Sequence, residues 1–432
     1  MANPIKLAAG AKGQSALLNR VGMITKRYGL TPAKMQRALD QFVKTLRRFD
    51  CGATFPATAA ALERHPAALE KYQTQGIEFA VHGYTHVDYS QLTAEEQLAH
   101  LHRAREVFAA AGIKAVGFRS PYLRQGDHLY AAIEAAGFSY VSNQPILWEV
   151  LNTDDLTPAG QDGYRRAIDF YAPWEANKRL SLPQLYNQLV EIPVSLPDDE
   201  ILLDRLGGNN DFVAKSWQSI LSQTHRREEL FTLQLHPERI ARCAEGLSAV
   251  LNEARALAPA VWIARLDEIA AWWQARTEAS VEITDVDEGK FQLTLTAPDG
   301  ITVLARGVQV KAPTAPWADG YRQVKATTFT LRAPRRPFIG LSPGAPPNLA
   351  SFLRQQGYIV EISVEGHRYS YYLEQNKFTT EQERTLLAQI EETNCPLVRL
   401  GRWPNGARSA LSITGDIDAL TLWDYGLRLF GK

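Results

Sequence analysis

From Val21 to Arg276, short apolar runs alternate with segments whose apolar positions recur every three or four residues. Short apolar runs are typical of buried strands, and the longer period is typical of amphipathic helices. We predict strands over residues 21–25, 52–58, 77–83, 115–122, 140–144, 189–197 and 231–237. Helices are predicted between them, over residues 31–49, 60–76, 93–112 and around 131–136. Alternation of this kind indicates an α/β layer or barrel.

Two of the predicted helices begin with recognisable signals. Thr31 is expected to be the N-cap of the first helix, with Pro32 in the first helical position. Thr93 and Glu96 have the spacing of a capping box at the start of the helix over residues 93–112. The first helix should pack its apolar face into the core, and that face consists of Met35, Leu39, Phe42, Val43 and Leu46.

The pattern changes after residue 276. Residues 247–276 are strongly apolar and are predicted to be helical, whereas residues 281–312 alternate apolar and polar positions around a Pro-Asp-Gly turn, as a small antiparallel sheet would. We place a domain boundary near residue 277, giving domains of residues 1–277 and 278–432. The proline-rich residues 332–349 are interpreted as a linker or loop. Helices over 349–357 and 380–392 and strands over 358–366, 368–374 and 409–414 are predicted after it.

Composition excludes some classes of partner. The chain has 432 residues, more than a single hydrophobic core usually serves, so two domains are expected. It has 47 charged residues of each sign, so its net charge is zero. No strong field is present to attract nucleic acid or an anionic membrane. Cys51, Cys243 and Cys395 are widely spaced, which suits free thiols in a reducing compartment. No apolar run is long enough for a membrane span or a signal peptide, and a cytoplasmic location is expected.

Polar residues follow several of the predicted strands. His82 and His86 lie four residues apart after the strand over 77–83, and Arg119 and Tyr122 close the next strand. His236 closes the strand over 231–237. Because the carboxyl ends of parallel strands meet at one edge, these side chains should converge there. The alternatives are two ordinary loop histidines, a surface ion pair for Arg119 and a hydrogen-bonded loop histidine for His236.

In this order, His-x-x-x-His, Arg-x-Pro-Tyr and Leu-His-Pro resemble the NodB-homology polysaccharide deacetylases, carbohydrate esterase family 4, of which the chain would be a divergent member. The resemblance covers roughly residues 21–276. It implies a distorted (β/α) barrel of the NodB type, followed here by a smaller α+β C-terminal domain. Removing an N-acetyl group requires a polarised amide carbonyl and an activated water, and one Zn²⁺ with an open position supplies both.

The resemblance implies a role for each matching residue. His82 and His86 would be ligands of Zn²⁺ or another divalent metal, together with one aspartate. A second aspartate would be the base, and Arg119 would orient it. The backbone N–H of Tyr122 would steady the oxyanion, and His236 would protonate the leaving amine.

The family's acidic motif is missing from its usual place. The sequence Thr-Phe-Asp-Asp-Gly belongs at the end of the first strand, where this chain has Arg27 and Tyr28. A cation and a phenol cannot replace a carboxylate ligand and a carboxylate base. A catalytically inactive saccharide-binding or scaffold protein is therefore the second hypothesis.

The C-terminal segment offers replacement acids. The predicted strand over 409–414 is followed by Asp416 and Asp418, whose side chains should point the same way because one residue separates them. We interpret Asp418 as the third metal ligand and Asp416 as the base, supplied by the same chain or by a neighbouring one in a homodimer. The alternative is that both aspartates begin a turn and cap the last helix.

Other residues near the predicted strand ends are weaker candidates. Asp198, Asp199 and Glu200 are a further source of acid, or a run that complements a helix dipole. Asp88 is expected to orient a histidine. Trp148 and Leu235 are expected to line a groove or pocket.

The leading functional hypothesis is a metal-dependent deacetylase that hydrolyses the N-acetyl group of a sugar or saccharide precursor. Its partner is a saccharide substrate, with no nucleic acid and no membrane span. A third hypothesis is hydrolysis of a small cyclic or linear amide. Substrate size separates the first and third, because a saccharide site should be an open groove rather than a closed pocket.

Overall fold

The computed structural model describes residues 24–25 and 27–428. Its main feature is a large sheet of twelve strands in the order β6-β5-β9-β10-β23-β1-β2-β3-β4-β8-β7, with β11 paired to β23 off this path. Every pairing in this sheet is parallel except that of β7 with β8. The strands are β1 (Ala53–Ala57), β2 (Ile77–Val81), β3 (Gly117–Phe118), β4 (Tyr140–Val141), β5 (Pro145–Leu147), β6 (Trp174–Glu175), β7 (Gln184–Tyr186), β8 (Leu189–Glu191), β9 (Val194–Leu196), β10 (Leu230–Leu235), β11 (Val261–Ile263) and β23 (Ser409–Gly415).

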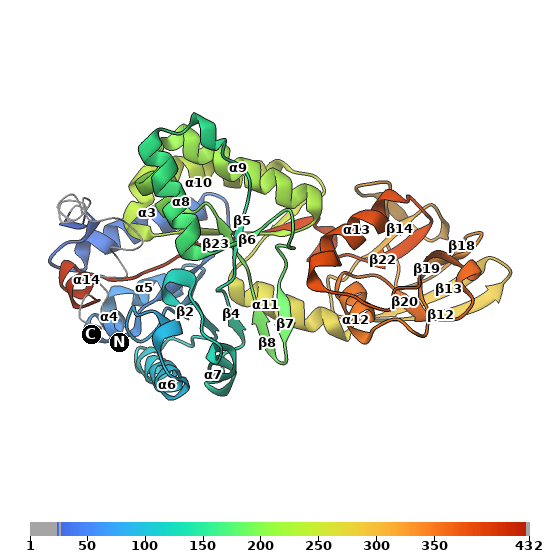
Figure 1. Cartoon of the computed structure of the whole chain (residues 1–432), viewed down its shortest axis with the longest axis horizontal. Coiled ribbons are helices and arrows are strands. Elements are labelled where there is room, and N and C mark those ends of the chain that lie inside the picture. Colours follow the sequence, from blue (N-terminus) through green and yellow to red (C-terminus); the bar gives the residue numbers. More distant parts are fainter. Residues whose placement is uncertain (1–23, 26, 429–432) are drawn as a thin grey trace.

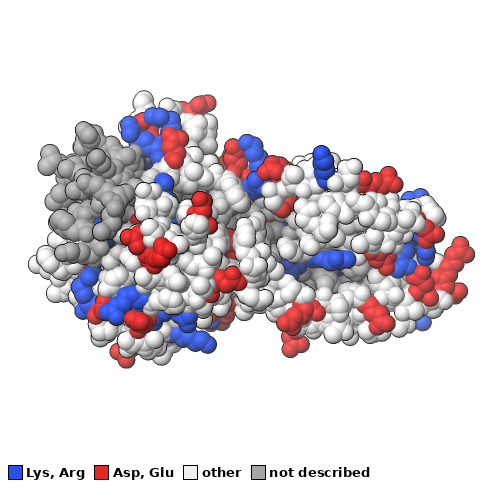
Figure 2. Space-filling view, turned by 60° about the horizontal axis from the view of Figure 1, so that its bottom comes forward, with Lys and Arg blue, Asp and Glu red and all other residues white. Residues whose placement is uncertain are grey.

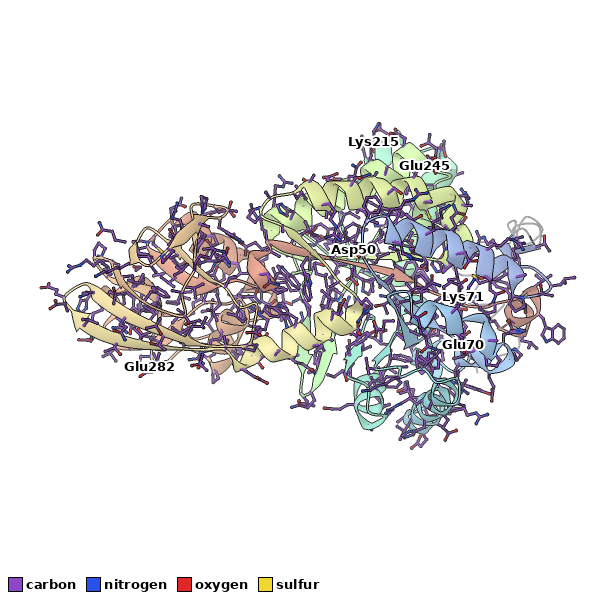
Figure 3. All side chains as sticks on the ribbon, turned by 180° about the vertical axis from the view of Figure 1, so that it is seen from behind. Asp50, Glu70, Lys71, Lys215, Glu245 and Glu282 are labelled. Carbon is purple, nitrogen blue, oxygen red and sulfur yellow. The ribbon has the colours of Figure 1, made fainter. Side chains whose placement is uncertain are left out.

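Helices cover both sides of this curled, incompletely closed sheet (Figure 1). They are α3 (Ala33–Arg47), α4 (Ala59–Arg64), α5 (Glu70–Gln73), α6 (Ala94–Ala110), α7 (Leu129–Ala135), α8 (Pro158–Tyr171), α9 (Asn210–Arg227), α10 (Ile240–Ala256), α11 (Leu266–Ala275) and α14 (Leu422–Arg428). Helix α10 packs against both α3 and α9. Lys215 of α9 and Glu245 of α10 lie on the outer side of these two helices (Figure 3). The expected α/β class is confirmed.

The strand β23 occupies the centre of the sheet. It pairs in parallel with β10 over residues 410–415, from Leu230↔Ala410 to Leu235↔Gly415, and with β1 at Thr54↔Thr414. All seven of its residues are buried. In Figure 1 it runs from the C-terminal part of the molecule into the middle of the large sheet. The place that the N-terminal strand was expected to take near the site is therefore occupied by the last strand of the same chain.

Residues 280–400 form smaller sheets beside the large one. The expected antiparallel sheet is present in the order β12-β13-β18-β15, a second has the order β16-β17-β14-β22, and a parallel one has the order β20-β19-β21. The strands are β12 (Ser280–Asp287), β13 (Lys290–Thr296), β14 (Val303–Arg306), β15 (Gln309–Lys311), β16 (Thr314–Pro316), β17 (Arg322–Val324), β18 (Thr328–Arg332), β19 (Arg336–Leu341), β20 (Val360–Ile362), β21 (Tyr369–Leu373) and β22 (Leu397–Leu400). The helices are α12 (Pro347–Gln355) and α13 (Glu383–Glu392).

Buried aromatic and ionic contacts join the two parts. The indole N–H of Trp403 donates to the Glu228 carbonyl at 3.0 Å, and the ring lies 5.5 Å from that of Trp273. Arg399 donates to the Glu228 carboxylate at 2.6 Å, and both side chains are largely buried. Breaking such a pair by removing one partner costs about 3–5 kcal/mol. The predicted boundary near residue 277 falls in the short helix η8 (Arg276–Glu278), and the division at that point stays a prediction.

Several predicted elements differ from the structure. Of the predicted strand over 21–25, residues 21–23 lie outside the described residues, and Ile24 and Thr25 are helical. The helix over 60–76 is broken into α4, η2 (Pro66–Ala68) and α5, because a proline cannot continue a helix. Helix α3 has Pro32 rather than Thr31 at its N-cap. The capping box of Thr93 and Glu96 is confirmed.

Two further corrections concern strands that the pattern concealed. Residues 261–263 form β11 within a segment predicted to be helical, since a run of three apolar residues satisfies either period. The proline-rich segment over 332–349 is not a simple linker, because it contains β19, the fully buried central strand of a sheet. Its prolines lie near the ends of this strand, where they do not interrupt the ladder.

Charged side chains of both signs are interspersed over the face in Figure 2, with no large area of one sign, in accord with the zero net charge. Across the described part of the chain, no helix has the length and apolar character needed to cross a membrane. Cys51, Cys243 and Cys395 are free thiols.

The central position of β23 generates a stability prediction. Ile413 is fully buried in β23, so Ile413→Ala should lower the free energy of unfolding by about 2–5 kcal/mol through lost burial and a residual cavity. Urea denaturation followed by circular dichroism measures the change. Val364→Ala is the matched control, because Val364 is 81% exposed, and it should change stability by no more than about 0.5 kcal/mol. Equal effects of the two substitutions would contradict a central strand.

Candidate active site

The carboxyl ends of four parallel strands bring the candidate residues to one edge of the sheet. His82 follows β2, Arg119 follows β3 and His236 follows β10. Asp416 and Asp418 follow β23. Because Leu235 pairs with Gly415 and Ala57 bridges to Ile417, the residues beyond β10, β1 and β23 lie at the same level. The convergence of the strand ends follows from this register.

Two histidines and Asp418 form a compact group. The Nε2 atoms of His82 and His86 lie 3.4 Å and 3.3 Å from Asp418 Oδ1. His82 Nδ1 lies 2.9 Å from the carbonyl oxygen of Arg119, so it must carry a proton and donate it. This tautomer leaves a lone pair on Nε2, directed at the Asp418 side of the group. A hydrogen bond from the other ring nitrogen to a carbonyl is the usual support of a metal-ligating histidine.

The donor set fits a divalent metal ion. Asp418 Oδ1 is buried and has no hydrogen-bond partner among the described residues, although it faces two imidazole nitrogens. A buried carboxylate oxygen without a donor is costly. Two imidazoles and one carboxylate are the ligand types of three-ligand zinc sites with an open position. The chemistry of this group therefore accounts for the unsatisfied oxygen.

Arg428 of α14 reaches the same group from the other side. Its Nη1 donates to Asp418 Oδ2 at 2.8 Å, and its Nη2 lies 2.8 Å from His86 Nδ1. Burial, and then the positive charge of Arg428, lower the pKa of His86 to about 3. Burial opposes ionisation of Asp418, but Arg428 and His86 hold its pKa well below the usual range. The imidazole is thus neutral and the carboxylate ionised, as metal ligation requires.

Asp416 is held by an arginine and a glutamine. Arg119 Nη1 donates to Asp416 Oδ1 at 2.8 Å, and Gln234 Nε2 donates to Oδ2 at 2.9 Å. Arg119 also donates to Thr414 Oγ1 at 2.8 Å and through Nη2 to Ser142 Oγ at 2.8 Å. Both members of the ion pair are buried. The carboxylate is therefore fixed in orientation beside the group of two histidines and Asp418.

His236 is paired with Asp199. Its Nδ1 lies 2.7 Å from Asp199 Oδ1, and its backbone N–H donates to Asp199 Oδ2 at 2.7 Å. Burial lowers the pKa of His236, but the Asp199 carboxylate more than compensates and raises it to about 10. The imidazole is consequently protonated at neutral pH, with Nδ1–H committed to Asp199.

Tyr122 adopts a left-handed backbone conformation at the end of β3. Its φ is 64°, and that of Leu123 is 56°. Such angles are uncommon outside glycine and cost free energy, which the surrounding structure must supply. The Tyr122 ring packs edge-on against His86, with 4.5 Å between the ring centroids. The turn thus brings the Tyr122 ring against the group of two histidines and Asp418.

The residues in the place of the family's aspartates also line the site cavity. Arg27 forms an ion pair with Asp204, and the Tyr28 ring lies 5.2 Å from the ring of Tyr425 in α14. The cavity shared by these residues, the histidines and the aspartates has a volume of about 70 Å³. This is well below the ~300–1,000 Å³ of sites that enclose a whole small molecule.

Four weaker expectations need correction. Asp88 accepts hydrogen bonds from Ser90 and pairs with Arg124, and the Arg119 carbonyl, not Asp88, orients His82. Trp148 and Leu235 are buried core residues outside the cavity lining. The acidic run is more than a simple helix start, because its members bind different groups: Asp198 accepts from the Ile201 N–H, Asp199 holds His236, and Glu200 pairs with Arg205. Asp198 and Asp199 lie with His236 in a second group of possible metal ligands, so a role as a further source of acid stays a prediction.

Sequence reasoning missed two residues of the site, Gln234 and Arg428. It named Asp199 as a candidate acid but not as the partner of His236, although Asp199 follows β9, the neighbour of β10. Gln234 lies in β10 two residues before His236, and both should therefore face the same side of the strand. Arg428 has no local signal, because only the packing of α14 brings it to the histidines.

The chain is similar to known proteins over part of its length. Residues 29–141 match the family model for polysaccharide deacetylase. A structure from Mycobacterium smegmatis that is assigned to the polysaccharide deacetylases is 20% identical, with 61% of this chain and 86% of that chain covered and a TM-score of 0.44. One from Pseudomonas aeruginosa PAO1 with the same assignment is 20% identical, with 55% and 72% covered and a TM-score of 0.42. The Puue allantoinase is 22% identical, with 55% and 72% covered and a TM-score of 0.41.

These TM-scores are below 0.5, so the assignment rests on the family model. No curated relative matches the chain at a significant level. The expected resemblance is confirmed: residues 29–141 match the family model for polysaccharide deacetylase.

Proposed function

We propose that this chain is a metal-dependent deacetylase that hydrolyses the N-acetyl group of a sugar or saccharide precursor. The observation that carries the proposal is the contact of Asp418 Oδ1 with the Nε2 atoms of His82 and His86, at 3.4 Å and 3.3 Å. Asp416 lines the same cavity as this group. Its ion-pair partner Arg119 is buried behind it, outside the lining. Both aspartates come from the same chain, so the site does not require a second subunit.

In this proposal His82, His86 and Asp418 hold a Zn²⁺ or similar divalent ion. When bound, such an ion polarises the amide carbonyl and lowers the pKa of a water molecule. Arg428 contacts both His86 and Asp418 and must move aside, at least in part, for the ion to bind.

The other residues have complementary tasks. Asp416 accepts a proton from the attacking water, and Arg119 and Gln234 fix the direction of its lone pairs. The backbone N–H of Tyr122 stabilises the negative charge that develops on the carbonyl oxygen. As the C–N bond breaks, His236 gives the proton on Nε2 to the leaving nitrogen, while Nδ1–H stays hydrogen-bonded to Asp199. The products are acetate and the free amine.

The size of the cavity favours a second candidate, hydrolysis of a small amide. A volume of about 70 Å³ accommodates the reacting group but not a whole sugar. A saccharide would need α14 to move, or would present only its acetamido group to the cavity. Parallel assays on acetamido-sugars of increasing length and on small cyclic and linear amides separate the two candidates.

A zinc titration of paired variants tests the ligand and base roles. Asp418→Asn should weaken zinc binding by about 100-fold or more, because it removes the charged ligand of the site. Asp416→Asn should keep zinc binding close to that of the parent chain but abolish turnover of an N-acetylated sugar, because it removes the base. Isothermal titration calorimetry gives the first readout and acetate release gives the second.

Each variant is the isosteric control of the other. Equal zinc affinity in the parent chain and Asp418→Asn would contradict the ligand assignment. A parent chain that binds neither zinc nor another divalent ion, yet still binds saccharide without turnover, would favour the inactive binding protein that Arg27 and Tyr28 suggest.

The dependence of activity on pH tests the pair of His236 and Asp199. With the pKa of His236 near 10, the protonated acid persists through neutral pH, and kcat/KM should fall only as pH rises through about 10. In Asp199→Asn the carboxylate no longer raises this pKa, and burial alone lowers it below the ordinary value of about 6.5. In this variant kcat/KM should begin to fall below pH 7, and its loss relative to the parent chain should be largest at pH 8–9. An unchanged alkaline limit in Asp199→Asn would exclude His236 as the acid.

A further inference from the structure

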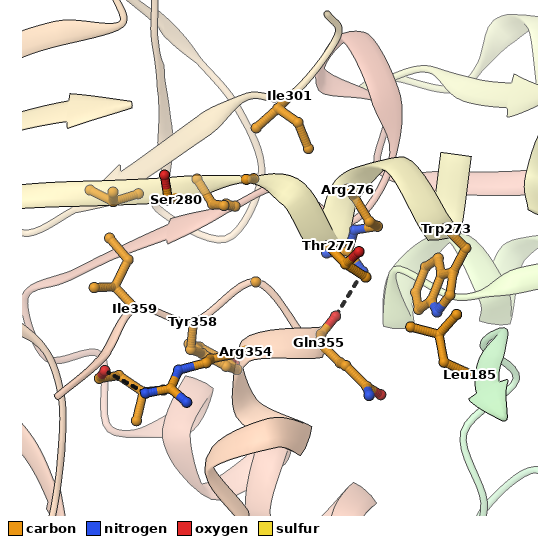
Figure 4. A pocket seen from close by; sticks show the side chains of 15 residues that line it. Leu185, Trp273, Arg276, Thr277, Ser280, Ile301, Arg354, Gln355, Tyr358 and Ile359 are labelled. Carbon is orange, nitrogen blue, oxygen red and sulfur yellow. Dashed lines mark hydrogen bonds between the residues drawn. The ribbon is translucent and has the colours of Figure 1, made fainter. Parts of the chain in front are cut away.

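A second cavity, of about 360 Å³, lies at the junction of the two parts of the molecule. One side is formed by β7 and the C-terminal end of α11, and the other by α12, β20 and β22 (Figure 4). Its residues are distinct from those of the candidate active site. Its volume is within the ~300–1,000 Å³ that is typical of small-molecule sites.

Two arginines give this cavity its charge. Arg276 and Arg354 are among its fifteen lining residues, and none of the fifteen is acidic. Neither arginine forms a salt bridge with any carboxylate in the described part of the chain. Arg276 Nη1 donates to the Gln355 carbonyl at 2.7 Å, and Arg354 Nη2 donates to the Val360 carbonyl at 3.4 Å. Arg399, which also lies at the junction, has an acidic partner in Glu228.

Arg276 is held in place but incompletely satisfied. Its guanidinium lies over the Trp273 ring, 4.5 Å from the centroid, so its orientation is fixed. Its Nε is buried and has no hydrogen-bond partner among the described residues. Burial, and then the like charges of Arg402 and Arg399, lower the pKa of Arg276 to about 9. An anion in the cavity would supply the negative charge that this guanidinium lacks.

The rest of the lining is largely apolar. Leu185, Ile301, Ile359 and Leu400 contribute to the walls around the arginines. An inorganic anion would leave these walls in contact with water, whereas an organic anion with a compact apolar group would cover them. Guanidinium groups bind carboxylates and phosphates through paired hydrogen bonds.

From this geometry we propose that the junction cavity binds a small organic anion, a carboxylate or a phosphate monoester, whose charged group meets Arg276 and whose apolar group packs against Leu185 and Ile301. The ligand would contact both parts of the molecule at once. Its binding is independent of the deacetylase proposal, because no residue of the active site is involved.

Calorimetry on the full chain tests this proposal with benzoate and phenyl phosphate as probes. At least one of them should bind with one-to-one stoichiometry, about tenfold or more tighter than the neutral benzyl alcohol and than inorganic phosphate. Arg276→Met keeps the apolar stem on Trp273 and removes the charge, and it should weaken binding of the anion by about tenfold or more.

Two further variants serve as controls. Arg354→Met removes the exposed arginine of the lining, whose guanidinium is turned to the Val360 carbonyl, and should weaken binding less than Arg276→Met does while leaving the fold intact, as judged by circular dichroism. Arg335→Met removes an exposed arginine outside the cavity and should leave affinity unchanged. The proposal is overturned if neither anion binds, if the neutral analogue binds equally well, or if Arg335→Met weakens binding as much as Arg276→Met does.

Discussion

The parallel hydrogen-bond ladder that seats β23 between β10 and β1 is the interaction on which both the fold and the site depend. It joins residues 410–415 to β10 and leaves every side chain of the strand buried. A parallel sheet is stable when both of its faces are covered, and here helices cover both. The register of this ladder also sets where β23 ends relative to its neighbours. As a result, Asp416 and Asp418 lie at the same edge of the sheet as His82 and His236.

The buried charges of the site are balanced in pairs. Asp416 is paired with Arg119, Asp418 with Arg428, and Asp199 with His236. A buried charge without a partner costs several kcal/mol, so each pair allows an ionised group to remain in a buried site. The arrangement also fixes protonation states: the Asp418 carboxylate stays ionised, and the imidazole beside Arg428 stays neutral while the imidazole beside Asp199 is protonated. Opposite charge states of two histidines thus follow from their neighbours.

The sequence allowed most strands near the site to be predicted, because each strand end is a local pattern. His82, Arg119 and His236 could be brought to one edge by this argument alone, and Asp416 and Asp418 by the same argument applied to the last strand. Residue Arg428 and the buried strand β19 could not, for different physical reasons. Arg428 reaches His86 across 342 positions of sequence, through packing that no local period encodes. Strand β19 lies within a proline-rich segment whose composition is typical of loops.

The central position of β23 also bears on how the molecule comes to exist. Thr58, next to β1, donates a hydrogen bond to the carbonyl of Asp418, 360 positions further along the chain. A ribosome releases β1, β2 and β10 long before β23, so the middle of the sheet stays open during most of synthesis. Until β23 arrives, the facing edges of β1 and β10 expose unpaired backbone groups, which are templates for wrong pairing. The nascent chain therefore has a long interval in which a chaperone, or an early contact of α3 with α10, must keep these two edges apart.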